Sequence, residues 1–141
     1  RYGRKNGKGF YDYDSKPKKL WSGLSELAPV KIAESTPEMV EDQKRRLLYR
    51  QAVEVARCWE EGVIDDPREA DVGAILAWGF APWTGGPITM IDQIGLKPFV
   101  EQADAYAAKY GDRFSPPQLL RDMAARDETF YGRFAGQKAA A

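Results

Sequence analysis

Apolar residues between positions 35 and 61 recur at helical spacing, with no Gly or Pro after Pro37 until Gly62. One face of the predicted helix is apolar at four positions: Leu48, Ala52, Val55 and Trp59. A second apolar stripe flanks the first: Tyr49, Val53 and Ala56. A helix with two apolar faces is either central in its domain or shared with a partner. If the helix is shared with a partner, Val53→Asp is expected to leave the domain folded but to weaken self-association or domain docking.

Further helices are expected after this one. Asp66-Pro67 begins a stretch that Gly79 ends, and a short apolar helix spans 88–94. A further helix has an apolar face at Phe99, Ala103, Tyr106 and Tyr110, and the last begins at Pro116-Pro117 and extends through Phe130 and Phe134. Strand patterns are scarce. The sequence therefore predicts an all-α fold of about five helices with short connections.

Four segments follow from these patterns. Residues 1–13 combine three glycines with aromatic residues and are expected to form a turn that runs into a short extended segment. Residues 14–34 have no sustained period and are interpreted as a linker held at a surface by Trp21 and Leu24. The helical body is predicted over 35–136, and a frayed tail over 137–141.

Composition limits the possible chemistry. The chain has 141 residues, 43% of them hydrophobic, which suits one domain with one core. It has no His and one Cys, which excludes histidine-based acid–base catalysis, most zinc sites and a disulfide scaffold. No apolar run approaches the length of a membrane span and no signal peptide is visible, so we expect a reduced, cytoplasmic protein. Because residue 1 is Arg, we also expect a piece of a longer protein.

Charge is uneven along the chain. Residues 1–19 hold seven Lys and Arg against two Asp, whereas the remaining residues have a net charge of −5. The Gly7-Lys8-Gly9 sequence is a candidate phosphate loop, with Arg4, Lys5 and Lys8 as contacts for the phosphates of coenzyme A. However, neither GxxxxGK[ST] nor GxGxxG is present, and a tight turn with positive φ at its glycines is favoured. We expect no nucleic-acid binding, since the body is acidic and contains no recognised reader motif.

The segment from Trp78 to Pro87 is rich in Gly, Pro and aromatic residues. Its candidate site residues are Phe80, Trp83, Gly85 and Gly86. The favoured interpretation is that Phe80 and Trp83 fill the core while the glycines allow close helix crossing. The alternative is the wall of an apolar acyl pocket or a domain-contact loop.

No other group of residues suggests catalysis. The acidic pairs Glu60-Glu61 and Asp65-Asp66 lie at helix ends, where carboxylates serve as caps. Cys58 has no base to activate it, so a buried, inert thiol is expected. We assign no catalytic, cofactor-binding or metal-binding residue in this chain.

The sequence resembles a known enzyme family. GRKNGKGFYDY at 3–13 resembles a segment near the end of the substrate domain of L-3-hydroxyacyl-CoA dehydrogenases. EADVGAILAWGFAPWTGGPITMIDQIG at 69–95, together with residues 46–64 and 110–120, resembles the further C-terminal domain of their multifunctional members, the alpha subunits of fatty-acid oxidation complexes. The resemblance covers nearly the whole chain, apart from the linker at 14–34 and the tail.

This resemblance implies a 6-phosphogluconate-dehydrogenase C-terminal-like helical domain, preceded by the tail of a substrate domain. It implies a parent enzyme that uses NAD in fatty-acid β-oxidation, and sometimes also hydrates enoyl-CoA. The catalytic His–Glu pair of the family lies in a domain that this chain lacks. The implied partners are the Rossmann and substrate domains of the same polypeptide, acyl-CoA in the parent, and a second copy in a homo-oligomer.

Three hypotheses remain open from the sequence. The first is a non-catalytic helical domain that supports substrate-domain packing and assembly. The second is an acyl-CoA-binding or dimerisation module in which Arg4, Lys5 and Lys8 hold phosphates and Trp83 faces the acyl group. The third is a related dehydrogenase with another substrate, such as hydroxybutyryl-CoA or a hydroxy acid.

Overall fold

The computed structural model describes residues 1–14, 16–32 and 34–140, the last five of these by their backbone alone. Ala141, at the end of the tail expected over 137–141, lies outside the described residues. The chain divides into two compact units, Arg1–Pro37 and Glu38–Ala141. The predicted all-α fold is confirmed, because the described residues are mostly helical and contain one small two-stranded sheet.

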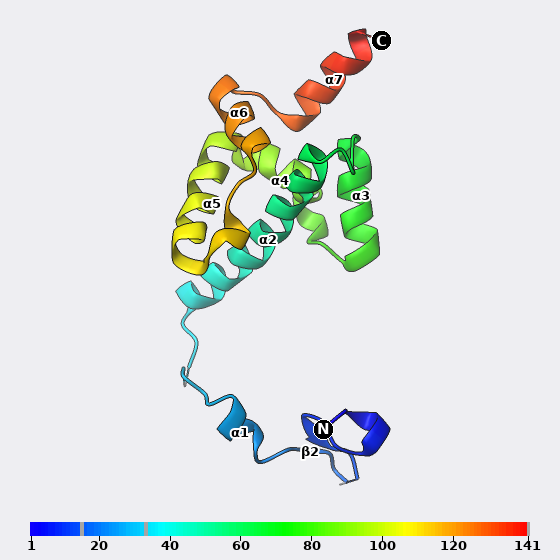
Figure 1. Cartoon of the computed structure of the whole chain (residues 1–141), viewed down its shortest axis with the longest axis vertical. Coiled ribbons are helices and arrows are strands. Elements are labelled where there is room, and N and C mark those ends of the chain that lie inside the picture. Colours follow the sequence, from blue (N-terminus) through cyan, green and yellow to red (C-terminus); the bar gives the residue numbers. More distant parts are fainter. Residues whose placement is uncertain (15, 33, 141) are drawn as a thin grey trace. The chain divides into compact units, whose positions relative to one another are not determined.

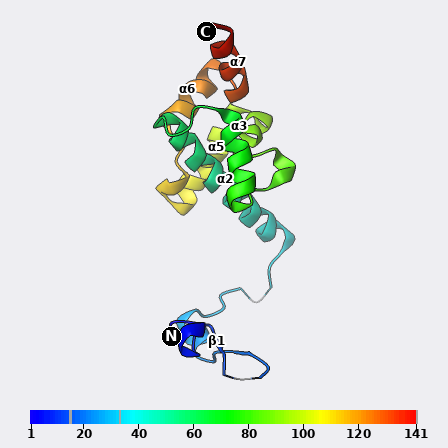
Figure 2. The same ribbon diagram turned by 90° about the vertical axis from the view of Figure 1, so that its right-hand side faces the viewer.

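The first unit is a small hairpin followed by one helical turn (Figures 1 and 2). Its elements are the 3-10 turn η1 (Arg4–Asn6), strands β1 (Tyr11–Asp12) and β2 (Lys19–Leu20), and helix α1 (Leu24–Leu27). The strands are antiparallel, with Tyr11 opposite Leu20. The extended segment expected after the glycines is therefore present, and the segment interpreted as a linker supplies its pairing strand. Trp21 packs under Arg1, whose guanidinium carbon lies 4.3 Å from the ring centroid.

The second unit is a bundle of helices joined by short connections (Figure 1). Its α-helices are α2 (Pro37–Glu60), α3 (Pro67–Trp78), α4 (Pro87–Ile94), α5 (Leu96–Tyr110), α6 (Gln118–Arg126) and α7 (Phe130–Ala140). Two 3-10 turns, η2 (Pro82–Thr84) and η3 (Asp112–Phe114), lie in the connections.

Helix α2 is central in this unit. Tyr49, Val53 and Ala56 are buried, and Tyr49 stacks on Phe99 of α5 with the ring centroids 4.5 Å apart. At the other end of α2, Trp59 contacts Phe130 of α7 edge-on at 5.2 Å. Both apolar stripes of the helix are therefore used inside its own unit.

The expected outcome of Val53→Asp was wrong. Val53 has no exposed surface and belongs to the core, so it is not free to dock against a partner. The sequence showed that two faces were apolar, but it did not show that neighbouring helices of the same unit cover both.

The last predicted helix is divided into two. Helix α6 ends at Arg126 because Asp127 adopts a left-handed conformation with φ 56°, and the backbone N–H of Glu128 closes the helix on the carbonyl of Met123 at 3.0 Å. Short polar residues such as Asp tolerate this conformation. Because this position holds Asp rather than Gly, the residue pattern did not indicate that the helix ends here.

Helices α5 and α6 are joined by an ion pair. Arg121 donates to both carboxylate oxygens of Asp104, at 2.6 and 2.8 Å. The hydrogen bond from Arg121 lowers the pKa of Asp104 from its usual 3.8. A lowered pKa adds stability above the pKa of the unfolded state, and this stability disappears as the pH falls through the folded pKa.

We therefore expect Asp104→Asn to lower the free energy of unfolding by less than about 1 kcal/mol near neutral pH, because both side chains are about two-fifths exposed. Urea unfolding of the wild-type protein and the variant at about pH 7 and about pH 2.5 measures this difference. The difference should be smaller at the lower pH, because protonation of Asp104 weakens the ion pair. A difference of equal size at both pH values would show that packing, rather than the ion pair, accounts for it.

Candidate functional site

The glycine loop of the first unit is a self-bonded turn. Gly3 and Gly7 have positive φ, as expected, and the N–H of Gly3 donates to the carbonyl of Lys8 at 2.8 Å. The N–H groups of Gly7 and Gly9 also bond to carbonyls of the same loop. A Cβ on Gly9 would lie 2.8 Å from Cα of Gly3, so close backbone approach requires this glycine. The glycine amides are therefore occupied by backbone partners and do not form a phosphate cradle.

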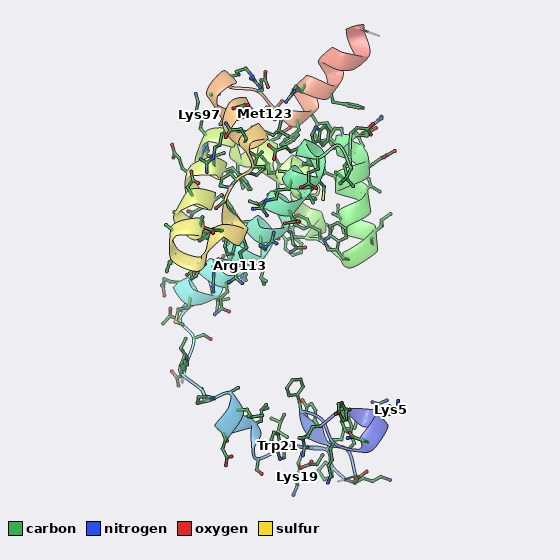
Figure 3. All side chains as sticks on the ribbon, in the orientation of Figure 1. Lys5, Lys19, Trp21, Lys97, Arg113 and Met123 are labelled. Atoms are coloured by element: carbon green, nitrogen blue, oxygen red, sulfur yellow. The ribbon has the colours of Figure 1, made fainter. Side chains whose placement is uncertain are left out.

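The three basic candidates lie on the outside of this loop. Arg4, Lys5 and Lys8 are exposed, and Figure 3 shows Lys5 at the edge of the first unit. The guanidinium of Arg4 lies 5.9 Å from the centroid of the Tyr13 ring. In the described part of the chain, no carboxylate forms an ion pair with Lys5 or Lys8. Their contact with coenzyme A phosphates stays a prediction.

The aromatic residues of the loop between α3 and α4 have different roles. Phe80 is 2% exposed and belongs to the core, as expected, whereas Trp83 is 83% exposed. The expectation that both rings fill the core was therefore wrong for Trp83. It follows Pro82 in η2, which turns its side chain away from the core residues.

Gly86 fits the loop against a buried carboxylate, whereas Gly85 approaches the side chain of Thr89. Both have positive φ, and a Cβ on Gly86 would lie 2.4 Å from the side chain of Asp71. Asp71 of α3 is 2% exposed and accepts hydrogen bonds from the N–H groups of Ile88 and Thr89, at 2.7 and 3.1 Å. Gly86 thus allows α3 to approach the start of α4 closely, as the sequence indicated for the glycines of this loop.

Asp71 is a cap supplied by a neighbouring helix. Gly86 has no side chain with which to cap α4, and Asp71 accepts from the free N–H groups of its first turn. Asp71 also accepts hydrogen bonds from the hydroxyls of Thr89 and Tyr131. One carboxylate therefore joins α3, α4 and α7.

Asp92 caps the start of α7 in the same way. It accepts from the N–H groups of Phe130 and Tyr131, at 2.9 and 3.1 Å. Burial raises the pKa of Asp92 above its usual 3.8; these two hydrogen bonds oppose the rise, and the charge of Asp71 adds to it. Two of the three acidic residues of the segment 69–95, Asp71 and Asp92, are thus used to hold helix ends. These caps could not be predicted from the sequence, because each carboxylate acts on a helix other than its own.

Of the other acidic candidates, Asp66 and Glu60 are caps, as expected. Asp66 caps α3 by accepting from the N–H of Arg68 at 2.9 Å, and Glu60 accepts from the N–H of Leu119 in the first turn of α6 at 2.7 Å.

Cys58 is only partly buried, so the expectation of a buried thiol was wrong in this respect. Within residues 1–14, 16–32 and 34–140, no group of three or more His, Cys, Asp or Glu could hold a metal ion.

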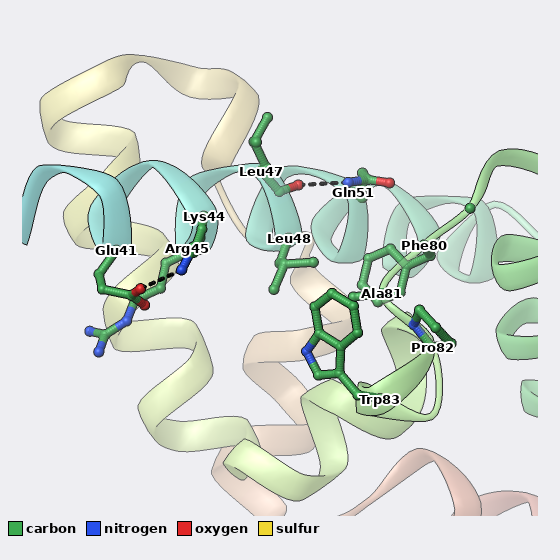
Figure 4. Close-up of a pocket in the computed structure, with 11 residues that line it drawn as sticks. Glu41, Lys44, Arg45, Leu47, Leu48, Gln51, Phe80, Ala81, Pro82 and Trp83 are labelled. Atoms are coloured by element: carbon green, nitrogen blue, oxygen red, sulfur yellow. Dashed lines mark hydrogen bonds and ion pairs between the residues drawn. The ribbon is translucent and has the colours of Figure 1, made fainter. Parts of the chain in front are cut away.

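A groove runs between α2 and the loop that carries Trp83 (Figure 4). Its volume is about 650 Å³. From α2 it is lined by Glu41, Lys44, Arg45, Leu47, Leu48 and Gln51, and from the loop by residues 79–83. Gln51 is held in place because it accepts from the indole N–H of Trp78 and donates to the carbonyl of Leu47, both at 2.9 Å. Of the candidates for an acyl pocket, Phe80 and Trp83 line this groove, whereas Gly85 and Gly86 do not.

The comparisons identify relatives across almost the whole chain. An alpha subunit of the fatty acid oxidation complex from Shewanella amazonensis is 41% identical and covers 93% of the chain. Counterparts from Vibrio parahaemolyticus and Pseudomonas syringae are 40% and 38% identical, over 93% and 98% of the chain. This chain is similar to part of a fatty acid oxidation complex alpha subunit. It spans about a fifth of the length of these alpha subunits.

The resemblance inferred from the residues is thus confirmed by three alpha subunits. No protein-family model matches the chain. Among the described residues, no helix is long and apolar enough to span a bilayer. The expected cytoplasmic location stays a prediction.

Proposed function

We propose that this chain is the C-terminal helical domain of an NAD-dependent L-3-hydroxyacyl-CoA dehydrogenase, within an alpha subunit of a fatty acid oxidation complex. The parent oxidises an L-3-hydroxyacyl-CoA to the 3-ketoacyl-CoA. This domain is not catalytic by itself, and it supports the packing of the substrate domain and the assembly of the parent. The observation that carries the proposal is the similarity, over 93% of the chain, to alpha subunits named for fatty acid oxidation.

The acidic residues support a structural role. The carboxylates of Asp71 and Asp92 accept hydrogen bonds from helix N–H groups. The sequence has no histidine and no GxGxxG motif, so its residues do not fit NAD, which we assign to another domain of the parent.

The outer face of α3 suits contact with the rest of the parent. Val72 and Leu76, one turn apart on α3, are 54% and 78% exposed, and Trp78 at the end of the helix is 57% exposed. Gly73 lies beside them, and a Cβ there would meet no atom within 4 Å. Exposed apolar side chains that gather on one helix are typical of a contact surface.

A chimera tests this proposal. We expect the Shewanella amazonensis alpha subunit to keep L-3-hydroxyacyl-CoA dehydrogenase activity when this chain replaces the segment that it matches. Deletion of the same segment should abolish the activity, because the substrate domain then loses its support. The measurement is NADH formation from L-3-hydroxybutyryl-CoA, normalised to the amount of folded protein.

Two results would contradict the proposal. One is a chimera that folds but is as inactive as the deletion. The other is NADH formation by this chain alone, which would show that it contains a catalytic site.

A further inference from the structure

Asn6 is the only asparagine of the chain, and Gly7 follows it directly. Both belong to the glycine loop of the first unit, where Asn6 is the last residue of η1 and is exposed to solvent. An asparagine side chain loses ammonia when the backbone nitrogen of the next residue attacks its amide carbon. This attack is easiest before glycine, because glycine has no side chain to shield the nitrogen. The Asn6-Gly7 pair therefore has the residues that this reaction requires.

The loop also holds the reacting groups together. The side-chain oxygen of Asn6 accepts a hydrogen bond from the backbone N–H of Lys8 at 3.3 Å, which is the pattern of an Asx turn. This hydrogen bond closes a ring that contains both the side-chain carbon of Asn6 and the nitrogen of Gly7. The N–H of Lys8 also points at the oxygen that becomes negative when the carbon is attacked, so it stabilises the developing charge.

Few contacts oppose the approach of the Gly7 nitrogen. Its N–H donates to the carbonyl of Arg4 at 3.2 Å, at the long end of the usual range. Position 7 also requires glycine, because φ is 71° and a Cβ would lie 2.7 Å from a carboxylate oxygen of Asp14. The constraint that requires glycine here therefore also leaves the attacking nitrogen unshielded.

We propose that Asn6 is a site of spontaneous deamidation. The Gly7 nitrogen gives its proton to hydroxide or water and bonds to the side-chain carbon of Asn6. The amide nitrogen on that carbon takes up a proton and leaves as ammonia, which produces a five-membered succinimide ring. One water molecule then opens the ring. Addition of water to the side-chain carbonyl gives aspartate, and addition to the main-chain carbonyl gives isoaspartate.

Either product changes the basic loop. It adds one negative charge to residues 1–19, which hold seven Lys and Arg against two Asp. Isoaspartate also inserts a methylene group into the main chain at position 6. There the N–H of Asn6 donates to the carbonyl of Gly3, and the N–H of Gly7 donates to the carbonyl of Arg4. Deamidation therefore weakens both the charge and the turn of this loop.

Mass spectrometry of the aged 141-residue chain tests the proposal. We expect the wild-type chain to gain the mass difference between an amide and an acid. The gain should be faster at mildly alkaline than at mildly acidic pH, because the attacking nitrogen must lose its proton. Asn6→Gln is the matched control: it keeps an amide, but the attack would then close a six-membered ring. Its gain should be at least about tenfold slower, which corresponds to a barrier higher by about 1.4 kcal/mol or more.

A second measurement identifies the product. An isoaspartyl methyltransferase transfers a labelled methyl group from S-adenosylmethionine to isoaspartate. It should label the aged wild-type chain, whereas aged Asn6→Gln should show only the background from the other residues. Ageing in guanidinium chloride gives the rate for the unfolded loop, with which the rate in the folded chain is compared.

Three results would overturn the proposal. The first is a wild-type chain that gains no mass at mildly alkaline pH, and the second is an equal gain in Asn6→Gln. The third is a rate in the folded chain more than about tenfold below that in guanidinium chloride, which would show that the loop protects Asn6. The proposal does not rest on the proposed function, because the chemistry of this loop does not depend on the activity of the parent.

Discussion

Val53→Asp is expected to abolish cooperative folding of the helical unit. Val53 lies in the middle of α2 with no exposed surface, and it packs within a cluster of buried apolar side chains. An unpaired buried charge costs about 3–5 kcal/mol, and the lost apolar contacts add to this cost. Small domains have a free energy of unfolding of about 5–15 kcal/mol, so a loss of this size removes most or all of it.

Leu47→Asp is the matched control. It places the same charge on the same helix, but Leu47 is 67% exposed, so the free energy of unfolding should change by no more than about 0.5 kcal/mol. Circular dichroism and urea unfolding of both variants give the comparison. A folded Val53→Asp protein with a normal unfolding transition would show that α2 is not central.

The contrast between these two positions shows what the sequence could predict. Periodicity identified the long amphipathic helix, and the structure confirms that its apolar stripes are largely buried. Periodicity cannot show whether a neighbouring helix of the same chain or a partner covers a given stripe. That depends on how α5 and α7 pack, which is set by contacts such as Tyr49 with Phe99 and Trp59 with Phe130.

The loop between α3 and α4 shows a second limit. Its composition indicated a tight, glycine-dependent turn, and the positive φ of Gly85 and Gly86 agrees with this. The same composition could not separate Phe80 from Trp83, because phenylalanine and tryptophan are both highly buried on average. Only the path of the backbone through η2 places one inside and the other outside.

The candidate sites could be predicted only in part. The exposed position of Arg4, Lys5 and Lys8 agrees with a basic arm. The groove between α2 and residues 79–83 was not predicted, because its two sides are far apart in the sequence and meet only when the helices pack.

Asp71→Ala is expected to lower the free energy of unfolding by about 3–4 kcal/mol. The carboxylate is 2% exposed and accepts from Ile88, Thr89 and Tyr131, so its loss leaves buried donors on two helices without a partner. It also removes a negative charge from the N-terminus of α4, where the helix dipole favours one. Asp66→Ala is the control, because it removes the cap of α3 and an exposed ion pair with Arg68, and should cost about 1 kcal/mol.

Gly86→Ala tests the same arrangement from the other side. The added Cβ would lie 2.4 Å from the Asp71 side chain, and φ at this position is 117°, which alanine rarely adopts. The methyl group must therefore push α3 away from α4 and weaken the bonds to Asp71. The double variant Asp71→Ala/Gly86→Ala should lose less free energy of unfolding than the two single variants lose together, since both changes act through one contact. Urea unfolding of the four proteins measures this coupling, and strict additivity would show that Gly86 is required for its backbone conformation alone.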